Sequence, residues 1–207
     1  LGEERWLMSF MAADGSYGNS YGYPSAAIMV LTLQNGIVQY GEPVLLDVPT
    51  RNWQYSRVLD WAYDDQSGDI VTITTCGPRS GYVLIRVSGE GVITSWADGS
   101  PRDINGLGGS GVGDSVGISF ANGYFIAASV SSSNITSQTN AGNGMTSVEV
   151  LKVNGTGTNA IDSIAYDSSS TDENGIKPPV TGGEKLHVCY LPISETDGTF
   201  LIVGTRF

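Results

Sequence analysis

A Gly-x-Ser-x-Gly motif at residues 113–117 places Ser115 where an α/β-hydrolase carries its nucleophile. Asp162 or Asp167, and then His187, follow in the chain order of the hydrolase triad. That chemistry needs a sharp turn from a strand into a helix beneath the serine, whereas the following "ISFANGYFIAAS" predicts a β-hairpin. His187 lies in the apolar run "KLHVCYL", which is typical of a structural histidine. We therefore do not expect a serine hydrolase.

Carboxylates near the ends of predicted strands could carry out a second chemistry, the hydrolysis of glycosidic bonds. Such an enzyme needs two carboxyl groups that flank the scissile bond. The candidates are Asp60, Asp114, Asp162 and Glu184. A glycan-acting hydrolase, or a lectin without catalysis, is therefore the alternative function that the sequence leaves open.

Two turns carry oxygen ligands of the kind that calcium prefers. They are Asp65-x-Ser67-x-Asp69 and "DENG" at 172–175, and neither has the spacing of an EF-hand loop. The Gly-x-Gly-x-x-Gly match at 106–111 lacks the preceding strand and the following helix of a dinucleotide site. We interpret the two acidic stretches as turns with solvated carboxylates, with a bound calcium ion as the alternative, and attribute the glycine match to chance. We expect no cofactor.

The stretch "DGSYGNSYGYPS" offers a contact surface rather than catalysis. Tyr17, Tyr21 and Tyr23 are separated by small polar residues, a pattern that gives adaptable contacts to proteins and sugars. The alternative is a loop that packs its own aromatic side chains. These three tyrosines are the candidate ligand-binding residues.

The elements that would position these residues follow from composition. The 207 residues carry a net charge of −11, which repels nucleic acid, and contain no apolar run of the roughly 18 residues that span a bilayer. No window of twelve residues keeps apolar side chains at helical spacing. Glycine is frequent, with 28 residues, and charged residues make up only 15%. The sequence therefore predicts an all-β chain.

Two elements repeat along the chain. Hairpins of an apolar strand, a glycine-containing turn and a second strand occur at residues 25–38, 81–93 and 146–158. A pair of apolar strands joined by a polar turn occurs at 58–75, 116–130 and 186–206. The N-terminal "RWLMSFMAADG" corresponds to the second strand of such a pair. The repeat therefore has four strands, and one all-β domain over residues 1–207 divides into units at about 1–50, 51–100, 112–170 and 180–207.

Successive four-stranded antiparallel units favour a β-propeller over the two alternatives, a β-sandwich or jelly roll and a β-solenoid. Counting three, four, four and two strands gives 13, which does not close a ring without supplying one strand twice. We expect a segment of a larger propeller. Cys76 and Cys189 each lie in an apolar run, so we expect buried free thiols, with one long-range disulfide as the alternative.

Residues 62–96, "AYDDQSGDIVTITTCGPRSGYVLIRVSGEGVITSW", resemble a blade of the bacterial β-propeller repeat family. The positions that carry the resemblance are Asp65, Gly68, Gly77, Gly91 and Trp96. The resemblance implies a propeller fold with a scaffold or adhesion role, as in bacterial surface proteins and phage tails, and implies no catalytic residues. We therefore expect a non-enzymatic structural or recognition protein of an extracellular surface or virion. Its partners would be protein subunits or cell-surface glycans.

Overall fold

The computed structural model describes residues 4–12, 25–46, 56–76, 79–97, 116–131, 145–169, 185–193 and 198–205. This part of the chain is all-β and contains no helix. The prediction of an all-β chain is confirmed. The three tyrosines at 17, 21 and 23 and the glycine-rich motif at 106–111 lie outside the described residues, as does the turn at 172–175.

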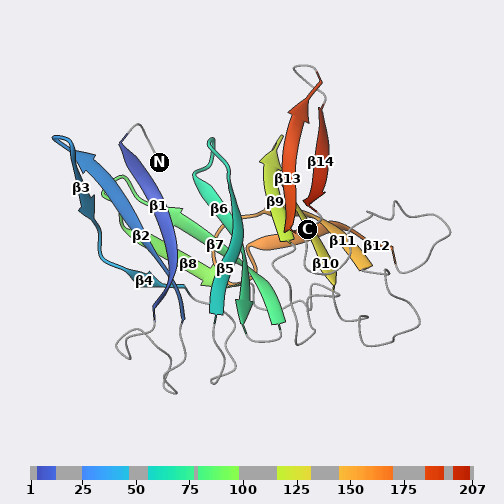
Figure 1. Cartoon of the computed structure of the whole chain (residues 1–207), viewed down its shortest axis with the longest axis horizontal. Coiled ribbons are helices and arrows are strands. Elements are labelled where there is room, and N and C mark those ends of the chain that lie inside the picture. The colour runs from blue at the N-terminus through green and yellow to red at the C-terminus, as the bar shows by residue number, and fades with distance from the viewer. Residues whose placement is uncertain are drawn as a thin grey trace.

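In the described ranges, fourteen strands form four antiparallel sheets (Figure 1). The first sheet contains β1 (Arg5–Ala12), β2 (Ser25–Gln34), β3 (Ile37–Tyr40) and the short β4 (Val44–Leu45). The second sheet contains β5 (Ser56–Tyr63), β6 (Asp69–Cys76), β7 (Arg79–Val87) and β8 (Ile93–Ala97) in that order. The third contains β9 (Val116–Ala121), β10 (Tyr124–Ser131), β11 (Met145–Val153) and β12 (Ile161–Ser169). The fourth pairs β13 (Lys185–Pro192) with β14 (Gly198–Thr205).

The turns follow from local sequence. Asn35-Gly36 and Asn122-Gly123 join adjacent strands, and both residues of each pair have positive φ, which is the type I′ geometry of two-residue hairpins. The predicted hairpin at 25–38 and the four-stranded repeat are confirmed by the strand orders. Two details were wrong. The last strand of the 146–158 hairpin begins only at Ile161, and β4, which pairs with β2, was not predicted.

The second sheet lies between the first and the third, and its two faces alternate along each strand. One face enters the core shared with the third sheet through Val71, Ile73, Tyr82 and Leu84. The other face enters the core shared with the first sheet through Ile70, Val83, Ile85 and Ile93. Successive residues of a strand point to opposite faces, so a continuous apolar run such as "DIVTITTC" of β6 suits a sheet that is covered on both sides.

Polar contacts cross both boundaries of the second sheet. The Tyr82 hydroxyl donates to Glu149 on β11 at 2.8 Å, and both side chains are buried. Arg86 on β7 pairs with Asp69 and also donates to the Gly155 carbonyl of the third sheet at 3.2 Å. Arg5 on β1 donates to the Gly89 carbonyl in the β7–β8 turn at 2.7 Å. These bonds fix neighbouring sheets in register with each other.

The four sheets form an open arc, with the first and the fourth at opposite ends (Figure 1). The inner strand β9 packs beside β5 on one side and beside β13 on the other. No closed ring of sheets is present among the described residues. The repeated four-stranded sheets are thus observed, whereas ring closure is not.

The buried pair of Tyr82 and Glu149 gives a test of how the second and third sheets are held together. Tyr82→Phe removes a hydroxyl that satisfies a carboxylate only 4% exposed, and we expect a loss of about 1–3 kcal/mol in the free energy of unfolding. Tyr124→Phe is the matched control, because Tyr124 is exposed, and should change it by less than about 0.5 kcal/mol. Urea denaturation measures both, and equal effects would contradict the packing described.

Candidate functional site

The residues of the hydrolase motif do not form a described site. Ser115 lies outside the described residues, and Asp167 and His187 are placed only as members of β12 and β13. Asp162 on β12 is exposed, and its carboxylate accepts a hydrogen bond from the Asn154 side chain across the β11–β12 turn. Its observed role is to hold that turn.

The glycosidase candidates are separated in the same way. Asp60 lies on β5, the inner strand of the second sheet, whereas Asp162 lies on β12, the outer strand of the third. A four-stranded sheet is about 14 Å wide, and the carboxyl groups of glycosidases lie about 5–10 Å apart. Asp60 and Asp162 therefore do not form such a pair. Asp114 and Glu184 lie outside the described residues.

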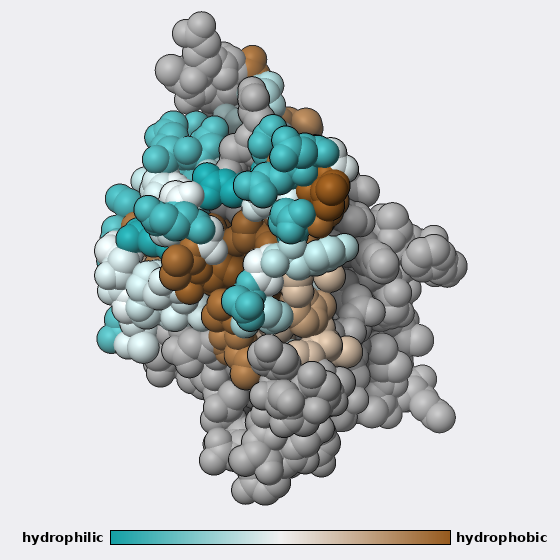
Figure 2. Space-filling view, turned by 90° about the vertical axis from the view of Figure 1, so that its left-hand side faces the viewer, coloured by the Kyte–Doolittle hydropathy of each residue, from teal (hydrophilic) through white to brown (hydrophobic). Residues whose placement is uncertain are grey.

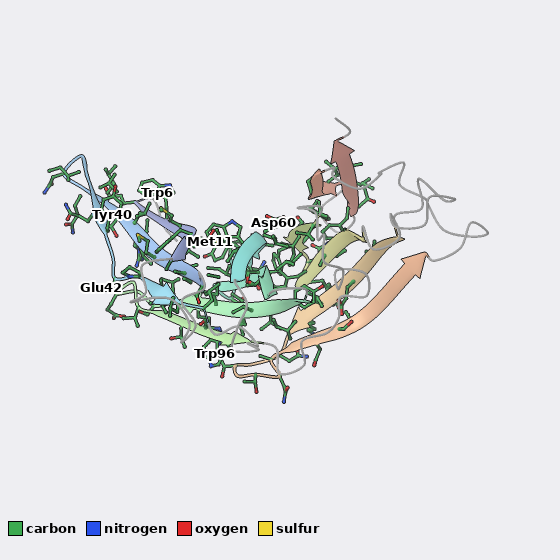
Figure 3. All side chains as sticks on the ribbon, turned by 60° about the horizontal axis from the view of Figure 1, so that its bottom comes forward. Trp6, Met11, Tyr40, Glu42, Asp60 and Trp96 are labelled. Carbon is green, nitrogen blue, oxygen red and sulfur yellow. The ribbon has the colours of Figure 1, made fainter. Side chains whose placement is uncertain are left out.

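Asp60 has a defined structural role (Figure 3). One carboxylate oxygen accepts from the Trp61 backbone N–H at 2.9 Å, and the other accepts from the Ile118 N–H of β9 at 3.0 Å. The register of β5 shifts between Val58 and Asp60, which marks a β-bulge. Bulges re-aim side chains, and here the bulge accompanies an Asp60 carboxylate that reaches the neighbouring sheet. The residue thus links two adjacent inner strands.

The oxygen-bearing side chains of the β5–β6 turn have partners within the protein. Asp69 is buried and paired with Arg86, and the hydrogen bond to Asp69 raises the pKa of that guanidinium further. Asp64, just before the turn, accepts from the Gln66 N–H and the Ser67 hydroxyl. Burial acts to raise the pKa of Asp64, but these hydrogen bonds outweigh it and the pKa is lowered. Within the described residues, no cluster of three or more His, Cys, Asp or Glu side chains could hold a metal ion.

An apolar surface covers the face of the first sheet that points away from the second. Residues opposite each other in a ladder share a face, and Leu7 pairs with Val30 in the core shared with the second sheet. Met8, which pairs with Met29, therefore lies on the opposite face. Trp6, Met8 and Tyr40 are 49%, 40% and 72% exposed. By register, this first-sheet outer face comprises Trp6, Met8, Phe10, Ala27, Met29, Leu31, Leu33, Val38, Tyr40 and Leu45. Ala27 is fully buried, so the exposed part of the face is the end with Trp6, Met8 and Tyr40.

Figure 2 shows this end of the molecule, with apolar side chains gathered across its middle and hydrophilic residues around them. Exposed apolar surface that is contiguous, rather than scattered, marks interaction sites on soluble proteins. The first-sheet outer face alternates with the buried face along the same strands, so it resembles the covered faces of the second sheet in composition.

The other end of the arc presents a smaller apolar face. Val188 of β13 and Phe200 of β14 pack against the third sheet. Side chains alternate along a strand, so the residue next to each of them points away from the third sheet. Cys189 and Leu201 are opposite each other on that outward face, and both are exposed. Cys189 is a free thiol, as expected, but the expectation that it is buried was wrong, because nothing described covers this face. The side chain of Cys76 is not described.

A pocket of about 340 Å³ lies between β1 and the start of the second sheet. Its lining comprises Arg5, Trp6, Leu7, Trp61, Ala62, Tyr63 and Ile70. Arg5 is the only charged side chain in it, and its guanidinium already donates to the Gly89 carbonyl. Figure 3 labels Trp6 and Met11 on β1, and of these two only Trp6 belongs to the described lining. The pocket is suited to an apolar group of a ligand, which would lie beside the guanidinium of Arg5.

Sequence reasoning did not select these surfaces. The stretch "RWLMSFMAA" holds apolar residues at both odd and even positions, which indicates a strand with two apolar faces. That signal was present, but it does not say which face the fold leaves open. The pocket joins residues from 5 to 70, and no local spacing predicts it.

The role of Asp60 can be tested directly. Asn in its place has one acceptor oxygen for two N–H donors, so Asp60→Asn should lower the free energy of unfolding by about 1–3 kcal/mol. Asp65→Asn, at an exposed turn position, is the control and should be nearly neutral. Urea denaturation gives the values, and a neutral Asp60→Asn would show that this carboxylate does not link the sheets.

No helix in the described part of the chain is long and apolar enough to cross a membrane. Comparison of the chain with protein-family models and with curated proteins finds no match.

Proposed function

We propose that this protein is a non-enzymatic structural or recognition protein, built as an arc of propeller-like blades, that works within an extracellular surface or virion assembly. The single observation that carries the proposal is the first-sheet outer face. Its exposed apolar residues repeat the construction of the faces that are buried inside the arc. A surface of this kind favours a permanent protein neighbour over open solvent.

The sheets stack in chain order, so the two end faces of the arc are complementary to each other. The second sheet packs one face against the sheet before it and the other against the sheet after it. The first-sheet outer face is therefore built to meet a preceding sheet, and the outward face with Cys189 and Leu201 to meet a following one. A second copy of the chain carries both halves. Its fourth sheet can stack on the first sheet of its neighbour, a head-to-tail contact that builds rings or filaments.

Composition supports an exposed assembly role. Charged residues make up only 15% of the chain, and glycine, serine, threonine and asparagine dominate the connections. The net charge of −11 opposes association between copies at long range, but the strand residues that form the first-sheet outer face are uncharged, and Glu4 lies at the rim of this face, opposite Leu33. Apolar contact acts at short range and salt screens the repulsion, so association should strengthen with ionic strength.

Sedimentation velocity over a range of protein and salt concentrations tests the proposal. We expect the purified chain to form oligomers, and Met8→Lys, which puts a charge in the middle of the outer face, to weaken association about tenfold or more. Ile164→Lys is the matched control, because Ile164 is an equally exposed apolar residue on β12. A monomer at all concentrations, or equal effects of the two variants, would contradict the proposal.

The free thiol of Cys189 reports the orientation of the contact. In a Cys76→Ser background, Met8→Cys should form an intermolecular disulfide with Cys189 of a second copy under mild oxidation. Asp65→Cys, on an exposed turn away from either end face, should not. If mass spectrometry finds the introduced thiol joined only to the same introduced thiol of another copy, the contact is symmetric and the head-to-tail arrangement is overturned.

A further inference from the structure

The ladder between β1 and β2 determines which backbone groups of β1 are paired. The Leu33 N–H donates to the Glu4 carbonyl at 2.8 Å, so Glu4 and Leu33 form a hydrogen-bonded pair. In an antiparallel ladder such pairs recur at every second residue. Trp6, Met8 and Phe10 therefore bond to β2, whereas the backbone groups of Arg5, Leu7, Ser9 and Met11 point to the other side. The register of β2 agrees, because its even residues bond to β3 and β4 at Gly41 and Leu46.

The outward side of β1 is an open sheet edge. Among the described strands, β1 is the terminal strand of the first sheet and pairs only with β2. Among the described residues, no backbone hydrogen bond reaches the main chain of Arg5, Leu7, Ser9 or Met11. Four consecutive donor–acceptor sites over seven residues are therefore available to a further strand.

The aromatic-lined pocket lies beside this edge. Arg5 and Leu7 contribute to it from β1, and Trp61 and Tyr63 contribute from β5 across the boundary between the sheets. On its other side β5 packs against the inner strand β9, which in turn packs against β13. The place beside β5 that an inner strand of the first sheet would occupy instead holds the pocket.

We propose that the open edge of β1 binds an extended segment of a partner protein, which adds a strand to the first sheet and inserts an apolar side chain into the pocket. The inference deepens the proposed function and rests on it, since it names a partner for the same assembly protein. The strand runs antiparallel to β1, because the inner pairs β5–β6, β9–β10 and β13–β14 of the other sheets are all antiparallel. Main-chain bonds supply affinity, and the pocket supplies specificity.

The open edge beside the pocket favours a peptide over a sugar. The polar side-chain groups of the described lining are the Arg5 guanidinium, which is already bonded to Gly89, the Tyr63 hydroxyl and the indole N–H groups of Trp6 and Trp61. A sugar held by these groups would leave the outward backbone groups of β1 unpaired. An extended peptide satisfies the four outward sites of β1 and needs only an apolar pocket. The chain carries a net charge of −11, so the segment is neutral or basic. About seven residues, or roughly 23 Å, match the length of the edge.

The segment comes from a different protein rather than from a second copy. Each described inner strand, β5, β9 and β13, is already paired within its own sheet, and a second copy would have to break such a pair to donate it. A peptide can still stand in for the partner. The probes are synthetic peptides with the sequences of β5 and of β13, the latter with Cys189→Ser, since both sequences form inner strands in this fold.

Amide hydrogen exchange by NMR gives the decisive readout on the full chain with saturating peptide. We expect exchange of the Leu7, Ser9 and Met11 amides to slow by about tenfold or more, with the Trp6 and Met8 amides unchanged because β2 already protects them. Peptides N-methylated at alternate residues, which keep their side chains but lose the donors, should not bind. Failure of both peptides to bind at about 1 mM, or binding without this alternate protection, would overturn the proposal.

Two pairs of variants separate the edge from the pocket. Ser9→Pro removes an outward N–H that plays no part in the β1–β2 ladder, so the fold should be retained while peptide affinity falls about tenfold. Ser9→Ala keeps the N–H and should bind normally. Tyr63→Ala should weaken binding as well, whereas Tyr124→Ala, an equally exposed tyrosine outside the pocket, should not. Normal binding by both Ser9→Pro and Tyr63→Ala would place the peptide elsewhere and overturn the proposal.

The two proposals fail separately. Association between copies depends on Met8 and the outer face, and Ser9→Pro leaves that face unchanged. If Met8→Lys dissociates oligomers but no peptide protects β1, only the strand-addition proposal falls. If peptides protect the alternate amides of β1 but the chain stays monomeric, the assembly between copies falls and the edge site stands.

Discussion

The burial of both faces of the second sheet is the constraint on which the rest of the structure depends. Val71 and Leu84 point one way into the third sheet, and Ile70 and Val83 point the other way into the first. Burying each such side chain contributes about 2 kcal/mol. A sheet with two apolar faces is stable in water only between two neighbours, so the second sheet requires the first and the third to be in place. Polar bonds such as Tyr82 to Glu149 then fix their register.

The same rule leaves the ends of the arc incomplete. The first sheet is covered on one face and carries Met8 and Tyr40 on the other, and the fourth sheet exposes Cys189 and Leu201. The open edge of β1 is a second unsatisfied feature of the first sheet, made of backbone groups rather than side chains. The first-sheet outer face would bind a stacked sheet, whereas the open edge of β1 would bind an extended strand. Within the described part of the chain, the first sheet has neither a neighbour on its outer side nor an inner strand, and this explains both features.

Much of the fold could be predicted from the sequence, because its signals are local. Asn-Gly pairs mark the hairpins at Gly36 and Gly123, and continuous apolar runs mark strands with two covered faces. The site could not be predicted in this way. Leu7 and Met8 are equally apolar, and only the register against β2 shows that one is buried and the other exposed. Cys189 was misassigned for the same reason, since an apolar run does not show which face has a neighbour.

Native-state hydrogen exchange over the whole chain tests the central claim, that covering both faces of the second sheet anchors the structure. We expect the amides of β6 and β7 to exchange slowest, only through global unfolding, and those of β13 and β14 to exchange through smaller local openings. The contrast arises because the described residues cover only one face of the fourth sheet. Equal protection of all four sheets, or faster exchange in β6 and β7 than in β13 and β14, would contradict it.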